Sequence, residues 1–212
     1  MFVDPRAPQR DAIQEAAAWI LRGGVVALPT DTLYGLAVDP FRADAVARLF
    51  AVKGRDADRA VPLIAADVPQ VVAHLGPLPP IAARLAERFW PGPLTLLVEA
   101  PSSLASDVTG GTARVGVRVP ADAVARAVCG VAGRPITATS ANLSGQPATA
   151  DPDDVERTLA DRIDLLLDTG RAPGGAPSTI VDVTASGLRL VRAGAISLDD
   201  IRIWLDAPPP QK

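Results

Sequence analysis

The sequence predicts an α/β fold, an open twisted mixed sheet with flanking helices. Two observations indicate this fold class. Segments with apolar residues at helical spacing alternate with short apolar runs of strand length along most of the 212 residues. Near the C-terminal end, several strand-like runs follow one another directly. Because parallel neighbours need a crossover connection, directly successive strands favour antiparallel pairs, and we expect a mixed sheet instead of a purely parallel, doubly wound one.

The individual elements follow in order from the N-terminus. A helix is predicted at 11–22, and Gly23-Gly24 ends it as a left-handed cap would. The apolar run 25–28 predicts a buried strand, which Pro29 ends because proline has no N–H for the ladder. Residues 30–35 should then form a turn at a strand end. The same periodicities predict helices at 44–52, 68–75, 80–89, 121–128, 155–159 and 198–205, and strands at 62–65, 94–98, 114–119, 135–139, 165–167, 179–183 and 188–191.

Composition predicts one soluble domain. The chain is 48% hydrophobic, which is enough for a full core. We expect a single domain over 1–212, with its core at about 10–205 and a flexible, proline-rich tail at 206–212. The N-terminus lacks a signal-peptide pattern, and no apolar run approaches the ~18 residues that span a bilayer. A membrane role is therefore not expected, and the predicted location is the cytoplasm.

Charge and residue types narrow the function. The net charge of -3 and the pI near 5.2 argue against a protein that mainly coats nucleic acid, although they allow a local basic cleft. A lone cysteine, Cys129, excludes an internal disulfide framework and a cysteine-rich zinc site. A lone histidine, His74, argues against histidine triads and histidine-rich metal centres.

Lys53-Gly54-Arg55 is the first candidate binding motif. Neither the P-loop pattern nor the dinucleotide fingerprint occurs in the sequence, so a nucleotide would need another cradle. Here glycine lets the backbone bend closely around a ligand, arginine can bind phosphate bidentately, and lysine adds a point charge. The alternative is a solvated helix end, because cations suit a helix C-terminus without any function.

Ser140-Ala141-Asn142 is the second candidate motif. Hydroxyls and an amide crowd a turn that ends in Gly145, where side-chain donors and free backbone N–H groups can form an anion-binding concavity. The alternative is a helix cap or an ordinary turn. Both motifs together predict a site for something small and anionic. Further hydroxyls and cations stand at other strand ends, at Thr30, Thr32, Tyr34, Arg118, Ser178 and Arg192.

Eight short motifs occur in order along the chain: PTDTLYGL (29–36), KGR (53–55), PLI (62–64), PGPLT (91–95), VGVRVP (115–120), SANLSG (140–145), STIVD (178–182) and RAG (192–194). Through these motifs the chain resembles the YrdC-like family of threonylcarbamoyl-AMP synthases from about Gly23 to Ser197. The resemblance implies an open, twisted α/β fold with a positively charged concave face, in the family's short, single-domain form. It also implies a nucleotidyltransferase that joins L-threonine, bicarbonate and ATP into L-threonylcarbamoyladenylate and releases pyrophosphate, for t6A biosynthesis at adenosine 37 of tRNA.

The resemblance also assigns roles, motif by motif. It implies that Lys53 and Arg55 are catalytic. Mg²⁺ is expected to bind through the ATP phosphates, without a dedicated protein site. The product is expected to pass to a tRNA threonylcarbamoyltransferase, and the sequence leaves open whether this protein contacts tRNA. The implied ATP-binding residues are Lys53, Arg55, Ser140, Asn142 and Arg192, and the implied threonine-binding residues are Thr32, Tyr34, Arg118, Ala138 and Ser178.

Four positions depart from the family pattern. Val61 stands where a polar ATP contact is usual, and Ala66 replaces a histidine near threonine. Arg114 stands where some relatives have threonine, and Ala148 replaces a serine near the nucleotide. These changes would weaken single contacts but leave both main motifs intact.

Two other kinds of protein could share the fold. One is a non-catalytic RNA-binding or regulatory protein, although the acidic charge and the aromatic content of 4% speak against base stacking. The other is the related domain of hydrogenase-maturation carbamoyltransferases, which are long chains with cysteine-rich zinc modules, and the single cysteine here does not fit them.

Overall fold

The computed structural model describes residues 1–54, 59–184 and 187–206. Its helices agree closely with the sequence pattern, and those at 68–75 and 80–89 have the predicted bounds. The main difference is at the helix predicted for 121–128, which starts after Asp122, whose side chain accepts from the Ala125 N–H, and continues to Ala132. The helices are α1 (Arg10–Leu21), α2 (Ala43–Lys53), α3 (Val68–Leu75), α4 (Pro80–Phe89), α5 (Ala123–Ala132), α6 (Pro152–Leu159) and α7 (Leu198–Asp206), with 3₁₀ turns η1 (Ser106–Thr109) and η2 (Ala160–Arg162).

The strands in the described ranges are β1 (Val26–Leu28), β2 (Gly35–Ala37), β3 (Leu63–Ile64), β4 (Leu94–Glu99), β5 (Arg114–Arg118), β6 (Ile136–Thr137), β7 (Thr139–Ser140), β8 (Leu165–Leu166), β9 (Thr179–Thr184) and β10 (Gly187–Arg192). They form a four-stranded sheet of order β7-β2-β1-β8 and a six-stranded sheet of order β10-β9-β4-β5-β3-β6. Both sheets contain parallel and antiparallel pairs. The predicted mixed α/β fold is confirmed, with its strands divided between two sheets.

The division arises where a single strand was predicted at 135–139. β6 pairs with β3 in the six-stranded sheet, whereas β7 pairs with β2 in the four-stranded one. The chain therefore passes from one sheet to the other at Ala138, whose N–H donates to the carbonyl of Pro62 at 2.8 Å. β2 itself was not predicted, because this three-residue strand begins with glycine and is buried throughout, so it gives no period-2 signal.

β1 lies between two apolar cores. Ala27 belongs to the larger cluster, which also includes Leu49 and Leu96. Val26 and Leu28 point the other way, into a second cluster beneath α1 and α5. A strand buried on both faces has no polar alternation, and this explains the unbroken apolar run that predicts it.

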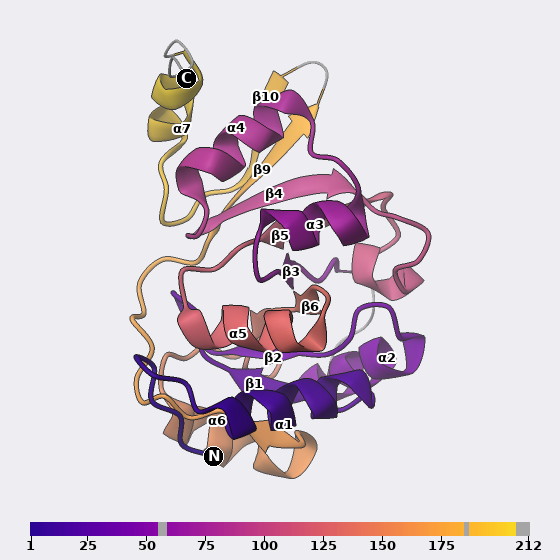
Figure 1. Ribbon diagram of the computed structural model, residues 1–212, viewed down its shortest axis with the longest axis vertical. Coiled ribbons are helices and arrows are strands. Elements are labelled where there is room, and N and C mark those ends of the chain that lie inside the picture. Colours follow the sequence, from indigo (N-terminus) through magenta and orange to yellow (C-terminus); the bar gives the residue numbers. More distant parts are fainter. Residues whose placement is uncertain (55–58, 185–186, 207–212) are drawn as a thin grey trace.

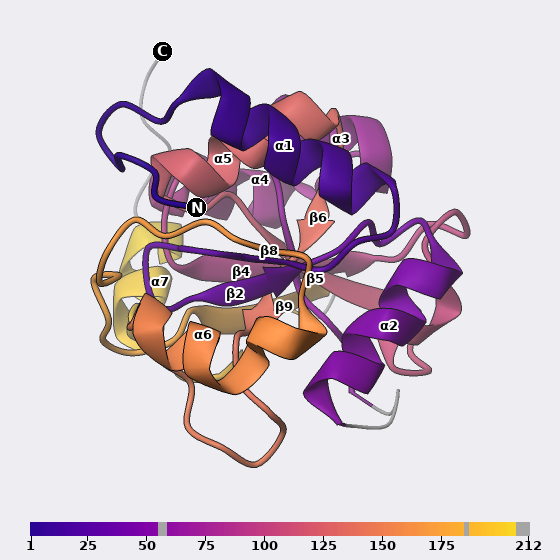
Figure 2. The ribbon, with the colours of Figure 1, turned by 90° about the horizontal axis from the view of Figure 1, so that it is seen from below.

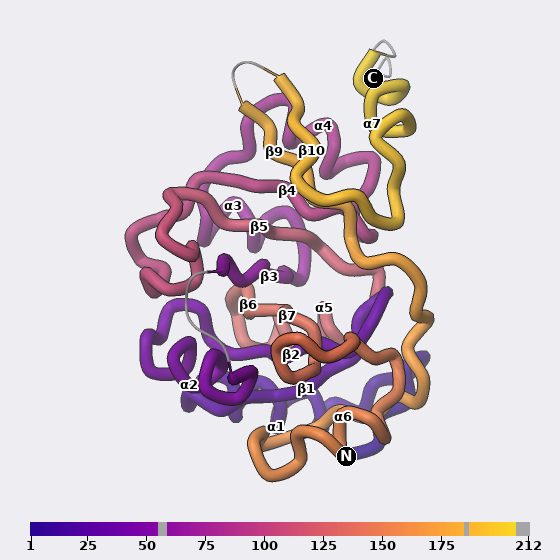
Figure 3. Tube along the Cα trace, turned by 180° about the vertical axis from the view of Figure 1, so that it is seen from behind, coloured from indigo at the N-terminus to yellow at the C-terminus, as the bar shows by residue number. Residues whose placement is uncertain are grey.

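The two sheets follow one another along the long axis of the molecule. Figure 1 shows α4, α7 and the β9–β10 pair at one end, and α1 and α6 at the other. Seen from below, α1 and α5 lie side by side on one face of the strands, while α2 and α6 lie on the opposite face (Figure 2). From behind, β4, β5, β3, β6, β7, β2 and β1 succeed one another, so the sheets meet at β6 and β7 (Figure 3).

None of the helices in the described parts of the chain combines the length and the apolar character that a membrane span requires.

Candidate functional site

A cavity of about 290 Å³ lies where the two sheets meet. The pairing of Gly35 with Ser140 places the loop before β2 beside β7, and the pairing of Leu63 with both Val117 and Thr137 places β3 between β5 and β6. Strand ends that are far apart in the sequence therefore converge. The predicted site residues that line the cavity are Thr32, Tyr34, Arg118, Ala138, Ser140, Ser178 and Arg192.

A compact turn after β1 forms one wall. The hydroxyl of Thr30 accepts from the backbone N–H groups of Thr32 (3.2 Å) and Leu33 (3.3 Å), and it donates to the carbonyl of Leu33 at 2.7 Å. Its Oγ1 also lies 3.1 Å from Oγ1 of Thr32. Side-chain hydroxyls that bond nearby backbone groups stabilise such turns. Both threonines are buried and line the cavity, so the turn presents a fixed hydroxyl-bearing wall.

Tyr34 continues this wall, but its hydroxyl is engaged elsewhere. The hydroxyl donates to the carbonyl of Gly170 at 2.7 Å and accepts from the backbone N–H of Thr169 at 3.1 Å. Burial raises the pKa of the phenol above its ordinary value. The phenol therefore stays neutral and anchors the segment that follows β8.

Arg118 and Asp31 form a buried ion pair beside the cavity. Arg118 is the last residue of β5 and is 7% exposed, and its Nη1 donates to Oδ1 of Asp31. Among the described residues, the second oxygen of Asp31, Oδ2, is buried and has no hydrogen-bond partner. The ion pair therefore uses a single oxygen of the carboxylate.

Arg192 forms a cationic part of the cavity wall, and its hydrogen-bond partners are neutral groups of Ser178. Its Nε and Nη2 donate to the carbonyl of Ser178 at 3.2 Å and 2.7 Å, and Nη2 lies 3.1 Å from the Ser178 hydroxyl. That hydroxyl is 2.9 Å from Oγ1 of Thr95. Partial burial of the guanidinium lowers the pKa of Arg192, and the positive charge of Arg118 lowers it further. Two neighbouring guanidinium groups therefore face one small, hydroxyl-lined space, which favours an anion there.

Close backbone packing requires glycine at position 194, two residues after Arg192. A Cβ atom on Gly194 would lie 2.2 Å from the carbonyl oxygen of Pro177 and 2.5 Å from the carbonyl carbon of Ser178. The next residue, Ala195, donates its N–H to the same Pro177 carbonyl at 2.9 Å. The two segments can touch only because residue 194 has no side chain, and this contact supports the backbone that carries Ser178.

The two motifs that the sequence singled out lie against each other. Lys53 is 3% exposed, and its Nζ donates to the carbonyls of Ser140 (2.6 Å) and Asn142 (2.9 Å), with Oδ1 of Asn142 at 3.5 Å. Gly54 ends α2 in the left-handed conformation, with φ of 59°. Lys53 and Asn142 do not themselves line the cavity; they hold the turn that brings Ser140 to it. Arg55 lies outside the described residues.

Several lining residues were not predicted as site residues. Arg59 and Ala60 come from the loop before β3, and Thr95 comes from β4. Thr95 belongs to one of the eight motifs, but the short apolar run around it gave no reason to assign it a role. Asp31, which pairs with Arg118 but does not line the cavity, was also not predicted as a site residue, because in the sequence it is only the middle residue of a Thr-Asp-Thr turn. Its pairing with Arg118 depends on tertiary structure, which spacing along the chain does not reveal.

The four departures from the family pattern lie mostly away from the cavity. Val61 is 1% exposed, and its N–H donates to the carbonyl of Val108. The N–H of Ala66 donates to Oε1 of Gln70, and Ala148 is exposed. Arg114 pairs with Asp182 further along the sheet.

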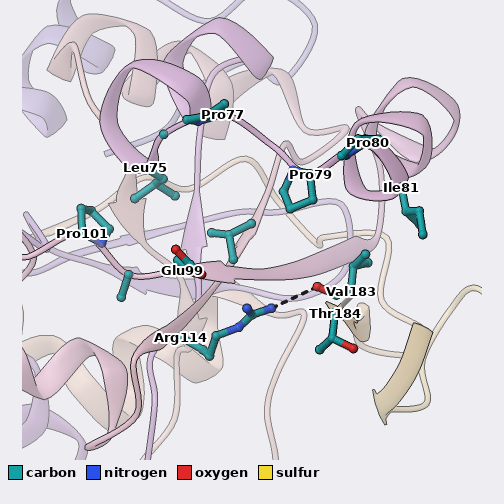
Figure 4. Close-up of a pocket in the computed structure, with 13 residues that line it drawn as sticks. Leu75, Pro77, Pro79, Pro80, Ile81, Glu99, Pro101, Arg114, Val183 and Thr184 are labelled. Carbon is teal, nitrogen blue, oxygen red and sulfur yellow. Dashed lines mark hydrogen bonds between the residues drawn. The ribbon is translucent and has the colours of Figure 1, made fainter. Parts of the chain in front are cut away.

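A larger cavity, of about 930 Å³, lies in the six-stranded sheet at the ends of β4, β5 and β9 that point away from the smaller cavity. Figure 4 shows its walls, formed by Leu75 and a series of prolines that includes Pro77, Pro79 and Pro80. Arg114 is its only cationic lining residue among those described, and its Nη2 already donates to Asp182 and to the carbonyl of Leu97. The charge and hydroxyls predicted for the site are therefore at the smaller cavity.

Two mixed sheets, flanking helices and a cationic, hydroxyl-lined cavity where the sheets meet define the class of this α/β protein. The chain belongs to the Sua5/YciO/YrdC family, whose model carries the description "Telomere recombination" and matches residues 18–194. The family predicted from the motifs is therefore confirmed.

Individual relatives agree with this assignment. The chain is 40% identical over 180 residues to the threonylcarbamoyl-AMP synthase of Halorhodospira halophila, a match that covers 85% of this chain and 94% of that one. It is 37% identical over 189 residues to the threonylcarbamoyl-AMP synthase of Pyrococcus abyssi, covering 89% of this chain but only 56% of that one. The chain thus spans about half the length of some curated relatives that it matches.

A solved structure agrees as well. The crystal structure of P. abyssi Sua5 complexed with L-threonine superposes with a TM-score of 0.91 at 34% identity, over 97% of this chain and 61% of that one. The crystal structure of Escherichia coli YciO has a TM-score of 0.85 over 95% of this chain and 98% of that one. At 24% identity, the second comparison bears on the fold alone.

Proposed function

We propose that this protein is an L-threonylcarbamoyladenylate synthase, which forms threonylcarbamoyl-AMP and pyrophosphate from L-threonine, bicarbonate and ATP. The observation that carries the proposal is the pair of guanidinium groups, Arg118 and Arg192, facing one small cavity lined by threonine and serine hydroxyls. The names of the relatives and the threonine complex of P. abyssi Sua5 support it. The proposed role is in t6A biosynthesis in the cytoplasm, with the product passing to a tRNA threonylcarbamoyltransferase.

The threonine half of the site would use the wall residues. Arg118 keeps guanidinium N–H groups beyond the one that it directs at Asp31, and an arginine fork matches the geometry of a carboxylate. The hydroxyls of Thr32 and Ser178 would accept or donate hydrogen bonds around the amino acid, with Tyr34 and Ala138 as surrounding walls. In this arrangement the substrate carboxylate lies against Arg118.

The ATP half would use the cationic and turn residues. Arg192 and Arg55 would offset phosphate charge, and Ser140 and Asn142 would bind the nucleotide from the turn that Lys53 holds. Mg²⁺ would enter with ATP and bind mainly through the phosphates, because it retains several waters and needs few protein ligands. Ser140 lines the cavity, and its hydroxyl carries an oxygen, the kind of ligand atom that Mg²⁺ prefers. Bound Mg²⁺ would neutralise charge that develops on the leaving pyrophosphate.

The chemistry asks mainly for positioning. The threonine amine adds to bicarbonate with loss of water to give a carbamate, and a carbamate oxygen then displaces pyrophosphate from the α-phosphorus of ATP. Orientation and charge neutralisation supply most of the catalysis in such transfers. A side-chain nucleophile is not needed, and Cys129 would not serve as one, because it is fully buried and burial raises the pKa of its thiol.

The test is pyrophosphate release from ATP with Mg²⁺ and bicarbonate, with L-threonine present or withheld. We expect threonine-dependent release by the wild type, and its loss in Lys53→Ala and Arg55→Ala. Arg157→Ala, which removes an exposed cation from α6, is the matched control and should keep full activity. Absence of threonine-dependent release from a folded wild type that still binds ATP or threonine would replace this proposal with a regulatory or RNA-binding role.

A further inference from the structure

We propose that Asp31 is a positioning residue for the substrate: it holds the guanidinium of Arg118 where that group binds the carboxylate of the amino acid. This inference rests on the proposed function. Asp31 does not line the cavity, so it would act through Arg118 and not by touching threonine.

The first step is the electrostatic need of Arg118. A guanidinium cannot lose its charge in a protein, and a buried charge without a partner is strongly destabilising. Arg118 is 7% exposed, and its side chain forms an ion pair with Asp31. Before substrate arrives, Asp31 is therefore the anion that keeps this cation in the site.

The second step is that Asp31 is itself held in place. It lies between Thr30 and Thr32, in the turn fixed by the Thr30 hydroxyl. The Asp31 side chain is only 10% exposed, and Oδ2 has no hydrogen-bond partner among the described residues. With one oxygen unused, the carboxylate depends on Arg118 as strongly as Arg118 depends on it.

The third step concerns the neighbouring charges. Arg192 lies close enough to Arg118 for their like charges to lower the pKa of Arg192, after the larger effect of burial. Repulsion alone would drive the two guanidinium groups apart. Asp31 also acts on an acidic neighbour: the pKa of Asp122 is raised, mainly by burial and partly by the negative charge of Asp31. Asp31 thus places an attractive charge behind Arg118 and keeps it beside Arg192, with its remaining N–H groups available to a second carboxylate.

Asp31→Ala should therefore weaken L-threonine binding by about 10- to 100-fold, the loss expected when a charged hydrogen bond is misplaced. The affinity for ATP, measured separately, should be unchanged. KM for threonine should rise while kcat at saturating threonine falls much less, because the reacting groups themselves are intact. Asp31→Asn, which keeps an oxygen acceptor for Nη1 without the charge, should fall between the wild type and Asp31→Ala.

The matched control is Asp182→Ala. Asp182 is also a buried aspartate paired with strand arginines, Arg114 and Arg189, but it does not line the small cavity. Its removal tests the cost of breaking such a pair, and threonine binding should be retained. Thermal unfolding of each variant shows whether it is folded at the assay temperature.

Two measurements separate positioning of Arg118 from a general loss of structure. L-Threoninol keeps the amine and the hydroxyl but lacks the carboxylate, so Asp31→Ala should not change its inhibition constant. In an Arg118→Ala background, adding Asp31→Ala should cause no further loss of threonine affinity, since both changes remove the same contact.

The outcomes are distinct. A wild type that neither binds threonine nor releases pyrophosphate would overturn the proposed function and this inference with it. An active wild type with an unaffected Asp31→Ala variant would overturn the inference alone. Equal losses for threonine and threoninol, or additive losses in the double variant, would show that Asp31 acts on the amine or on folding, and would also overturn it.

Discussion

The ammonium group of Lys53 donates a 2.6 Å hydrogen bond to the backbone carbonyl of Ser140, 87 residues further along the chain. Lys53 ends α2 and Ser140 ends β7, so this bond joins a helix C-terminus to the strand that borders the cavity. The lysine is buried against backbone carbonyls, and its charge is therefore part of the architecture of the turn at 140–142 as well as of the proposed ATP site.

Replacement of Lys53 should destabilise the protein as well as inactivate it. Lys53→Met keeps much of the aliphatic volume but leaves the carbonyls of Ser140 and Asn142 without their charged donor. We expect a loss of about 1.5 to 3 kcal/mol in the free energy of unfolding, measured by urea denaturation. An inactive Lys53→Met protein with wild-type stability would instead indicate that the lysine serves the nucleotide alone.

Arg192 should contribute to activity through the paired N–H groups of its guanidinium as well as through its charge. Arg192→Ala removes the donors to Ser178 and the second cation of the cavity, and we expect kcat/KM for pyrophosphate release to fall by about 10²- to 10³-fold. Arg192→Lys restores the charge but not the paired contacts, so it should recover only part of the activity. Full recovery by lysine would mean that charge alone is sufficient. Arg189→Ala, on the same strand and 72% exposed, is the control.

Gly194 should tolerate no side chain. In Gly194→Ala the new methyl group would overlap the carbonyl of Pro177, and the segment carrying Ser178 must move away. We expect destabilisation of about 1 to 3 kcal/mol from this overpacking, together with weaker threonine binding, and urea denaturation and calorimetric titration with threonine would measure both effects.

Gly133→Ala is the comparison for this variant. A methyl group at Gly133 would have no heavy atom within 4 Å among the described residues, and Gly133 does not line the cavity. Its φ of 69° carries a backbone cost of its own, so some loss of stability is expected there without a change in binding. Threonine binding reduced equally in both variants would contradict a local role for Gly194.

Cys129 should make stability depend on alkaline pH. Burial raises the pKa of its thiol above the ordinary value of 9.0. The unfolded chain therefore releases this proton first, so the stabilising effect is complete below about pH 9 and is lost as the pH rises above it, at up to about 1.4 kcal/mol per pH unit. Urea denaturation between about pH 8 and pH 10 should show a steeper decline for the wild type than for Cys129→Ala. Parallel declines would show that the thiol does not contribute.

The regular helices were the most predictable part of the fold. The apolar spacing in 68–75 and 80–89 is sustained for two turns or more, and each helix carries proline in its first turn, so the bounds were clear. The three-residue strand at Gly35–Ala37 was missed, because it is too short and too uniformly buried to show a period. The split of 135–139 into two strands was missed for a related reason, since a bend at one alanine leaves no signal in the apolar pattern.

For the site, the sequence identified residue types better than contacts. Thr32, Arg118, Ser178 and Arg192 do converge on one cavity, as their positions at strand ends suggested. Their partners could not be read from the sequence. The pairing of Asp31 with Arg118, 87 residues further along the chain, depends on how the two sheets meet, and local sequence spacing does not reveal such a contact.

The crossing of the chain at Ala138 has a mechanical consequence. Thr32 and Ser140 belong to one sheet and its loops, whereas Arg118, Ser178 and Arg192 belong to the other, and the chain crosses from β6 to β7 within a single residue. The cavity is therefore lined by residues from two different sheets and their loops. A rotation of one sheet against the other would change the distances between these two sets of side chains, so substitutions in the apolar contacts between the sheets should alter substrate affinity from a distance.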